Sequence, residues 1–339
     1  MSVQILSTAA NAVLPIVLLI LLGYFLRRKG FLTEQFVALG NKLVFRICLP
    51  AMMFVNVYGI ASLSEIRWDL CLYVIAAVAV LFALGWIMAL SATGDRRKRG
   101  VLLQCSFRSN YAIIGLPLAT TLGGEAAASV AAVLSAIAVP LFNVLAVISL
   151  SVFVQGEGER VSGKKLLKTI SKNPLIIGVL TGLAALLLRW WQERQFGAVV
   201  FSLQRDLTPV YTVLRNLKDI TSPFALLMLG GQFRFAAVKE LWKEVAAGTL
   251  CRTVIAPLVG VGAAVVLSAQ GLLPCGAAEY PALIALFGSP VAVSSAIMAR
   301  EMHNDEQLAT QLVVWTSVVS IATIFLTVCL MMGMGILSI

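Results

Sequence analysis

Residues 100–122, GVLLQCSFRSNYAIIGLPLATTL, form an apolar stretch that is interrupted by Arg108, Asn110, Gly115 and Pro117. As a helix, a stretch of this length spans about 30 Å of hydrocarbon. Proline removes a backbone donor and clashes with a carbonyl of the preceding turn, and glycine lowers the cost of bending. Inside a bilayer such a break persists only where protein or water surrounds it. The stretch therefore predicts a broken membrane helix beside a polar site.

The composition of the whole chain is typical of a helical membrane protein. Of its 339 residues, 60% are hydrophobic and only 12% are charged, which is too little polar surface for a soluble globule of this size. The apolar blocks are continuous, without the period-two alternation of a barrel, and only helices satisfy their own backbone groups there. We expect ten transmembrane helices, over residues 8–26, 37–57, 69–91, 100–122, 126–154, 173–190, 207–231, 241–269, 281–300 and 306–335.

The basic residues predict how these spans are oriented. Short cytoplasmic loops of membrane proteins are enriched in Lys and Arg. Nineteen basic residues, Arg46 and Arg252 among them, fall at one alternating set of span ends, and six fall at the opposite set. We therefore expect a multi-pass protein of the cell membrane with both termini outside. The net charge of +10 follows from these loops, so the expected surrounding is the lipid bilayer, and no nucleic-acid partner is expected.

The spacing of the prolines indicates an internal repeat. Pro50 and Pro117 are 67 residues apart, and so are Pro223 and Pro290. Two copies of a five-span unit face opposite ways across the membrane. We therefore expect an all-α transmembrane fold of two inverted five-helix repeats, with broken crossover helices in the fourth and ninth spans. The chain then divides into a first repeat, a short cytoplasmic loop and a second, inverted repeat, over residues 1–154, 155–172 and 173–339.

The two broken spans together predict one substrate site. Span 281–300 carries Gly288 and Pro290 near its middle. The N-termini of half-helices carry partial positive charge, which suits an anion. Paired breaks at matching places in two repeats indicate a site where these helix ends meet. The expected substrate-binding residues are Asn110, Tyr111, Gly115, Pro117, Ser289, Pro290, Ser294 and Ser295.

Three other polar residues in the apolar spans are candidate accessory residues. Arg108 is explained equally well by snorkelling to the headgroups and by a role in anion entry. Asp219 is a candidate proton or cation site, although an interfacial ion pair explains it better. Asn56 is a candidate for the site or for a helix–helix hydrogen bond.

Motifs for catalysis and for tightly bound cofactors do not occur in the sequence. The six cysteines contain no CxxC pair, and His303 is the only histidine, so neither a metal site nor a disulfide framework is expected. No Walker A, HExxH or GxSxG pattern occurs. We expect neither an enzyme nor a cofactor, and the sequence leaves open whether H⁺ or Na⁺ is coupled to transport.

At these motifs the chain resembles the auxin efflux carrier family, which includes bacterial members and the plant PIN auxin transporters. Asn110 precedes Pro117 in the pattern N-x-x-x-x-G-[LI]-P. Pro290 precedes Ala299-Arg300-Glu301-Met302, which is similar to an Ala-Lys-Glu-Tyr motif of the family. The resemblance covers essentially the whole chain, and the two crossover motifs are its most specific parts.

The resemblance implies the fold shared by bile-acid symporters and PIN transporters. It implies a scaffold domain of spans 1, 2, 6 and 7 and a transport domain of spans 3–5 and 8–10, with elevator-type alternating access and a homodimer. It also implies that Asn110 contacts a substrate carboxylate. Auxin itself is disfavoured, because residues 155–172 are short and Ser295 stands where plant members often carry a second proline.

These observations predict a secondary carrier or facilitator of small organic anions, such as malonate, malate or auxin-like acids. Two alternatives stay open at this point. One is a sodium-coupled organic anion symporter of the bile-acid type, which would share the architecture. The other is a membrane receptor or sensor, which would need a signalling domain or a long polar tail.

Overall fold

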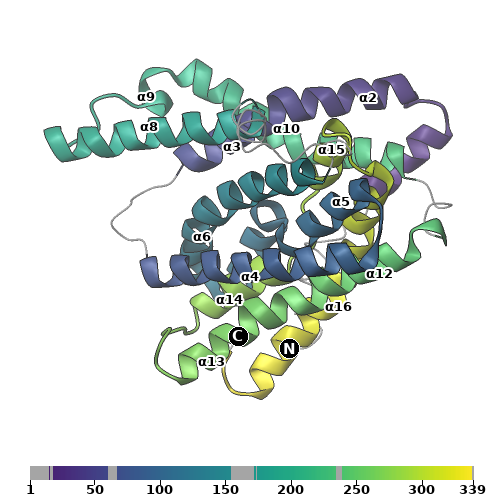
Figure 1. Cartoon of the computed structure of the whole chain (residues 1–339). Helices are drawn as coiled ribbons and strands as arrows, with labels where there is room; N and C mark the ends of the chain where they lie inside the picture. The colour runs from purple at the N-terminus through teal and green to yellow at the C-terminus, as the bar shows by residue number, and fades with distance from the viewer. Residues whose placement is uncertain are drawn as a thin grey trace.

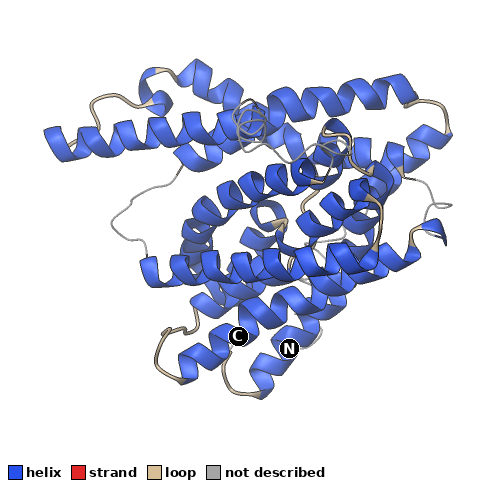
Figure 2. Cartoon of the chain, in the orientation of Figure 1, coloured by secondary structure: helices blue, strands red, loops and turns tan. Residues whose placement is uncertain are grey.

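The computed structural model describes Pro15 and residues 18–59, 67–153, 172, 174–233 and 239–337, except for the side chains at 113, 117 and 136. These residues form helices and one isolated two-residue β-bridge (Figure 2). A first helix covers 18–28. The others are α2 (Glu34–Leu43), η1 (Val44–Cys48), α3 (Leu49–Tyr58), α4 (Trp68–Ala92), α5 (Arg96–Phe107), η2 (Tyr111–Gly115), α6 (Leu116–Val152), α8 (Pro174–Phe196), α9 (Leu203–Asp206), α10 (Thr208–Gln232), α12 (Trp242–Leu250), η3 (Cys251–Ile255), η4 (Leu258–Gly262), α13 (Ala263–Ala269), α14 (Glu279–Gly288), α15 (Ser294–Glu301) and α16 (Glu306–Gly333), where η marks a π-helical turn.

Six helical stretches within the described residues are long and apolar enough to cross a membrane. Each overlaps one of the expected spans, so the all-helical membrane architecture is confirmed. The six are Glu34–Tyr58, Trp68–Ala92, Leu118–Val152, Pro174–Phe196, Trp242–Ala269 and Glu306–Gly333.

The other four expected spans differ from a long apolar helix for separate reasons. Span 8–26 lies partly outside the described residues. Span 207–231 forms the full-length helix α10, which carries the charged residues Arg215, Lys218 and Asp219. Spans 100–122 and 281–300 are each split into two shorter helices. The inverted repeat of ten spans therefore stays a prediction.

The expected spans 100–122 and 126–154 meet inside α6, at Gly123 and Gly124, where the backbone leaves the helical conformation. Gly124 has φ 65° and ψ −159°, a combination that only glycine adopts without strain. The chain can therefore turn sharply here and begin the next span after a single non-helical pair.

The helices pack in two groups, which Figure 1 shows as an upper and a lower layer. Helices α2, α3, α8, α9 and α10 pack on one another along the top of the view, and helices α4, α5, α6, α12, α14 and α16 pack below them. The helix at 18–28 joins the first group, because Gly23 and Gly230 let its backbone approach that of α10 closely. Helix α15 contacts both groups.

Three prolines in these helices each lie two residues after a π-helical turn. Pro50 follows η1, Pro117 follows η2 and Pro257 follows η3. Proline lacks a backbone N–H and crowds the carbonyl four residues earlier. A π-helical turn widens the helix just there, so the helices continue through these prolines instead of breaking.

Candidate functional site

The two broken spans cross each other, and their extended segments pair. Helix α5 ends at Phe107 and α14 ends at Gly288. Between the half-helices, Ser109 and Val291 form an isolated antiparallel bridge. The backbone N–H of Asn110 donates to the carbonyl of Pro290 at 2.8 Å. The pairing satisfies backbone groups that a break in a membrane helix would otherwise leave without partners.

The first break lies seven residues before the proline that was expected to cause it. The non-helical segment covers residues 108–110, whereas the helix runs on through Gly115 and Pro117. The expectation of a break at Pro117 was therefore wrong, because the π-helical turn η2 accommodates this proline. The second break was expected correctly, since Pro290 lies within the non-helical segment 289–292.

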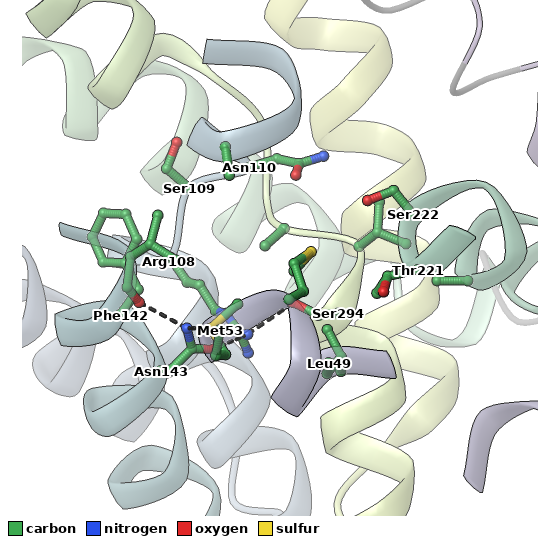
Figure 3. A pocket seen from close by; sticks show the side chains of 16 residues that line it. Leu49, Met53, Arg108, Ser109, Asn110, Phe142, Asn143, Thr221, Ser222 and Ser294 are labelled. Atoms are coloured by element: carbon green, nitrogen blue, oxygen red, sulfur yellow. Dashed lines mark hydrogen bonds between the residues drawn. The ribbon is translucent and has the colours of Figure 1, made fainter. Parts of the chain in front are cut away.

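A cavity lies between the crossing segments and the upper layer of helices (Figure 3). The empty space in and around it is about 490 Å³, part of which is open to the outside. Its walls come from both groups of helices, so the site is built where the groups meet. It is lined by Leu49, Met52 and Met53 of α3, Val139, Phe142 and Asn143 of α6, Thr221, Ser222 and Ala225 of α10, and Arg108, Ser109, Asn110, Ala112, Ala292, Val293 and Ser294 of the crossing segments.

The guanidinium of Arg108 is the one charged group among the residues that line this cavity. The residue is only 3% exposed. It donates to Oε1 of Gln104 at 3.2 Å, to Sδ of Met298 at 2.6 Å, and at 2.8 Å each to Oδ1 of Asn143 and Oγ of Ser294. All four acceptors are neutral, and in the described part of the chain no carboxylate pairs with Arg108. The snorkelling interpretation is therefore wrong, because this side chain points into the protein and not to the headgroups.

Asn110 supplies a second polar group to the cavity. The residue is 4% exposed, and its Nδ2 has no hydrogen-bond partner among the described residues. Figure 3 shows its amide among the side chains around the cavity. A buried donor without a partner costs about 1–3 kcal/mol, so a bound acceptor would be stabilised here.

Several of the expected site residues do not line the cavity. Tyr111 is buried and donates its hydroxyl proton to the carbonyl of Ala282 at 3.3 Å. Ser289 donates to the carbonyl of Ala285 at 2.5 Å. Gly115 lies where η2 approaches α14, and an added Cβ would come within 3.1 Å of the Ala285 carbonyl. Tyr111 and Gly115 thus hold the first broken span against α14, whereas the Ser289 hydroxyl bonds to the end of its own helix.

The other expected residues divide between the cavity and its surroundings. Ser294 lines the cavity, and Pro290 holds the crossing through its carbonyl. Ser295, the next residue after Ser294 in α15, is buried, and its Oγ has no partner among the described residues. The side chain of Pro117 lies outside the described atoms. Neither Asn56, half-buried in α3, nor Asp219 is among the cavity residues.

Asp219 lies on the surface of α10, where its side chain is 63% exposed and 4.0 Å from Arg215. The structure thus favours the ion pair over a buried cation site. Within the described residues, no three His, Cys, Asp or Glu side chains gather closely enough to hold a metal ion.

Sequence reasoning missed four polar residues of the cavity, and one of them is Ser109 of the first crossing segment. Asn143 accepts from Arg108 and donates to the carbonyl of Val139 at 2.7 Å, and it could have been noticed as a lone amide in an apolar span. Thr221 and Ser222 face the cavity from α10. Their position beside Pro223 was a weak signal, because Ser and Thr are common in membrane helices.

Comparison with known proteins identifies the family. The model of the membrane transport protein family matches residues 8–328, nearly the whole chain. The chain belongs to this family. The resemblance to auxin efflux carriers is thereby confirmed, and the protein is a membrane transporter and not an enzyme.

Two archaeal relatives support the same conclusion. An uncharacterized transporter from Methanocaldococcus jannaschii is 24% identical over 324 residues, which cover 93% of this transporter and 96% of the relative. An uncharacterized transporter from Methanothermobacter thermautotrophicus is also 24% identical over 324 residues, with the same coverage. The similarity thus extends over both broken spans.

Proposed function

We propose that this transporter is a secondary carrier that moves small organic anions, in particular short carboxylates, across the cell membrane by elevator-type alternating access. The observation that carries the proposal is the buried Arg108 guanidinium at the wall of the cavity, which has only neutral partners in the described part of the chain. An unpaired charge costs several kcal/mol when it is buried. A substrate carboxylate would offset that cost.

The groups around Arg108 suit a carboxylate better than a cation or a neutral solute. The amide of Asn110 can donate to an oxygen without adding a fixed charge. The cavity also borders the N-termini of two helical segments, through Ala112 of η2 and Ser294 of α15, where partial positive charge favours anions. Together these charged and neutral donors would bind an anion with moderate affinity, so that it can also dissociate.

The two-layer packing supports the elevator part of the proposal. The crossing segments belong to the lower layer, whereas Met53 and Thr221 line the cavity from the upper layer. A displacement of one layer against the other would move the anion with the crossing segments and change the side on which the cavity opens. The family resemblance further suggests a homodimer in which the upper layers meet.

Uptake by purified transporter in liposomes tests the anion assignment. Vesicles are supplied with radiolabelled malonate, malate or indole-3-acetate, with a neutral sugar and an organic cation as comparison solutes. We expect uptake of at least one carboxylate and at least a tenfold loss in Arg108→Gln, because the anion loses its counter-charge.

The matched control for this test is Arg215→Gln, which removes an arginine that is exposed on α10. It should transport like the wild type. Uptake of the cation but of no carboxylate, or full anion uptake by folded Arg108→Gln protein, would contradict the proposal.

A further inference from the structure

A second arginine lies inside the crossing, away from the cavity. Arg252 of η3 is 0% exposed and is among the largest fully buried side chains. Its Nε donates to the carbonyl of Ser289 at 2.9 Å, one terminal nitrogen donates to Phe107 at 3.2 Å, and the other donates to Leu286 at 3.1 Å and Phe287 at 3.2 Å. All four acceptors are backbone carbonyls.

These carbonyls belong to the C-terminal ends of the two half-helices that run into the crossing. Phe107 is the last residue of α5, Leu286 and Phe287 lie in the last turn of α14, and Ser289 caps α14. The last carbonyls of a helix have no partner within it, and each helix end carries about half a negative elementary charge. Two converging ends therefore present about one negative charge, which one guanidinium balances.

Such a group of carbonyls is the kind of site that holds a coupling cation. In transporters with broken helices, half-helix C-termini and unwound backbone carbonyls coordinate Na⁺. In this transporter the side chain of Arg252 occupies the group of carbonyls where such a cation would bind. The fork of the guanidinium also reaches several carbonyls at once, so it holds the two half-helices together as a bound ion would.

We infer that Arg252 is a built-in cation of the transporter: its guanidinium permanently occupies the carbonyl site at the crossing, so this site takes no sodium ion and anion transport proceeds without sodium. The occupancy of the carbonyl site is argued from the contacts of Arg252 alone, and the claim of sodium-independent anion transport rests on the proposed function. Arg252 is accordingly a positioning residue, since it lines no wall of the cavity, whereas Arg108 does.

The first test measures the melting temperature of the purified full-length protein in sodium-free detergent buffer. For the wild type, sodium chloride should have the same effect as potassium or choline chloride at equal ionic strength, because the guanidinium already occupies the carbonyl site. Arg252→Ala should melt several degrees lower and should regain part of the loss with millimolar guanidinium chloride, which can enter the vacated site.

Two variants make this measurement interpretable. Arg215→Ala removes an exposed arginine and should show neither the loss nor the rescue. Arg252→Lys keeps a charge but cannot reach both helix ends, and it should melt between Arg252→Ala and the wild type. It also serves if Arg252→Ala cannot be purified. A sodium-specific rise in the wild-type melting temperature, or an Arg252→Ala protein as stable as the wild type, would overturn the inference.

The second test compares carboxylate uptake into liposomes in sodium, potassium and choline buffers of equal ionic strength. We expect equal initial rates in the three buffers. Stimulation by sodium would overturn the inference while leaving the anion assignment intact. If no carboxylate is transported at all, the proposed function fails, and the melting experiment still decides the role of Arg252.

Discussion

At the scale of single residues, the two buried arginines of the crossing have different roles because they have different hydrogen-bond partners. Arg252 donates to backbone carbonyls only, and its task is complete without a ligand. Arg108 donates to the side chains of Gln104, Asn143, Ser294 and Met298. Side chains can release a guanidinium and rearrange, whereas helix-end carbonyls cannot do so without unwinding the helix. Arg108 is therefore the arginine that can turn to a substrate.

Asn110→Ala should lower carboxylate transport at least tenfold, equivalent to about 1.4 kcal/mol, because it removes an amide donor from the cavity. Asn110→Asp should be worse, since it adds a like charge beside the anion. Initial uptake rates in liposomes measure both effects. The matched control is Asn216→Ala, which removes an exposed asparagine from α10. Normal uptake by well-folded Asn110→Ala protein would remove Asn110 from the site.

At the scale of elements, a proline does not by itself break a helix of this protein. The π-helical turns before Pro50, Pro117 and Pro257 let these prolines sit inside continuous helices. The true breaks occur where a second extended segment is available to pair, as between Ser109 and Val291. A proline motif alone therefore locates the region of a crossover but not the residue at which the helix ends.

Gly124→Ala should destabilise the protein by about 1–3 kcal/mol, because a side chain is strained in the backbone conformation of Gly124. An added Cβ would meet no atom within 4 Å, so a clash does not contribute. Thermal unfolding in detergent measures the effect. Gly94→Ala is the matched control, since Gly94 also has open space and has no positive φ. Equal melting temperatures for the two variants would show that the turn tolerates alanine and that strain at Gly124 is negligible.

At the scale of the whole molecule, the cavity exists only because two groups of helices meet. Its wall combines α3 and α10 with the crossing segments and α6. Contacts between the groups also occur away from the cavity, as where Nε2 of Gln307 donates to the carbonyl of Gln232 at 3.4 Å. Relative movement of the groups must break such contacts, which makes the elevator proposal testable.

A cross-link between cysteines placed at Gln232 and Gln307 should stop carboxylate uptake, because it ties the two layers together outside the cavity. The background lacks the native cysteines, a short reversible dithiol reagent forms the link, and reduction should restore uptake. The control pair is Gln204 and Tyr211, which touch within the upper layer and whose link should leave uptake unchanged. Full uptake by cross-linked Gln232–Gln307 protein would argue against layer movement.

The charge asymmetry predicts that residue 270 lies outside the cell and residue 94 inside. In the same cysteine-free background, Gln270→Cys should react with a membrane-impermeant thiol reagent added to intact cells, and Gly94→Cys should react only after the membrane is opened. Both positions are exposed, so reactivity reports the side of the membrane. The reverse labelling pattern would invert the predicted orientation.

The helical membrane class and the region of the site could be predicted because their signals are local. A span is a run of apolar residues, and the breaks are marked by Gly288, Pro290 and the polar residues Arg108 and Asn110 within such runs. The residue at which the first helix ends could not be predicted. It depends on pairing with Val291, which lies far along the chain.

The sequence by itself determined that this is a polytopic helical membrane protein with two interrupted spans, because hydropathy and backbone restrictions act on neighbouring residues. Only the tertiary structure decided the roles of the two arginines. Arg252 was counted with the cytoplasmic charges and Arg108 had two equal interpretations, yet both are buried in the crossing. Met298 lies 190 residues from its partner Arg108, and Phe107 lies 145 residues from its partner Arg252. A charge count carries no information about such partners, because burial and pairing arise only when distant segments pack together.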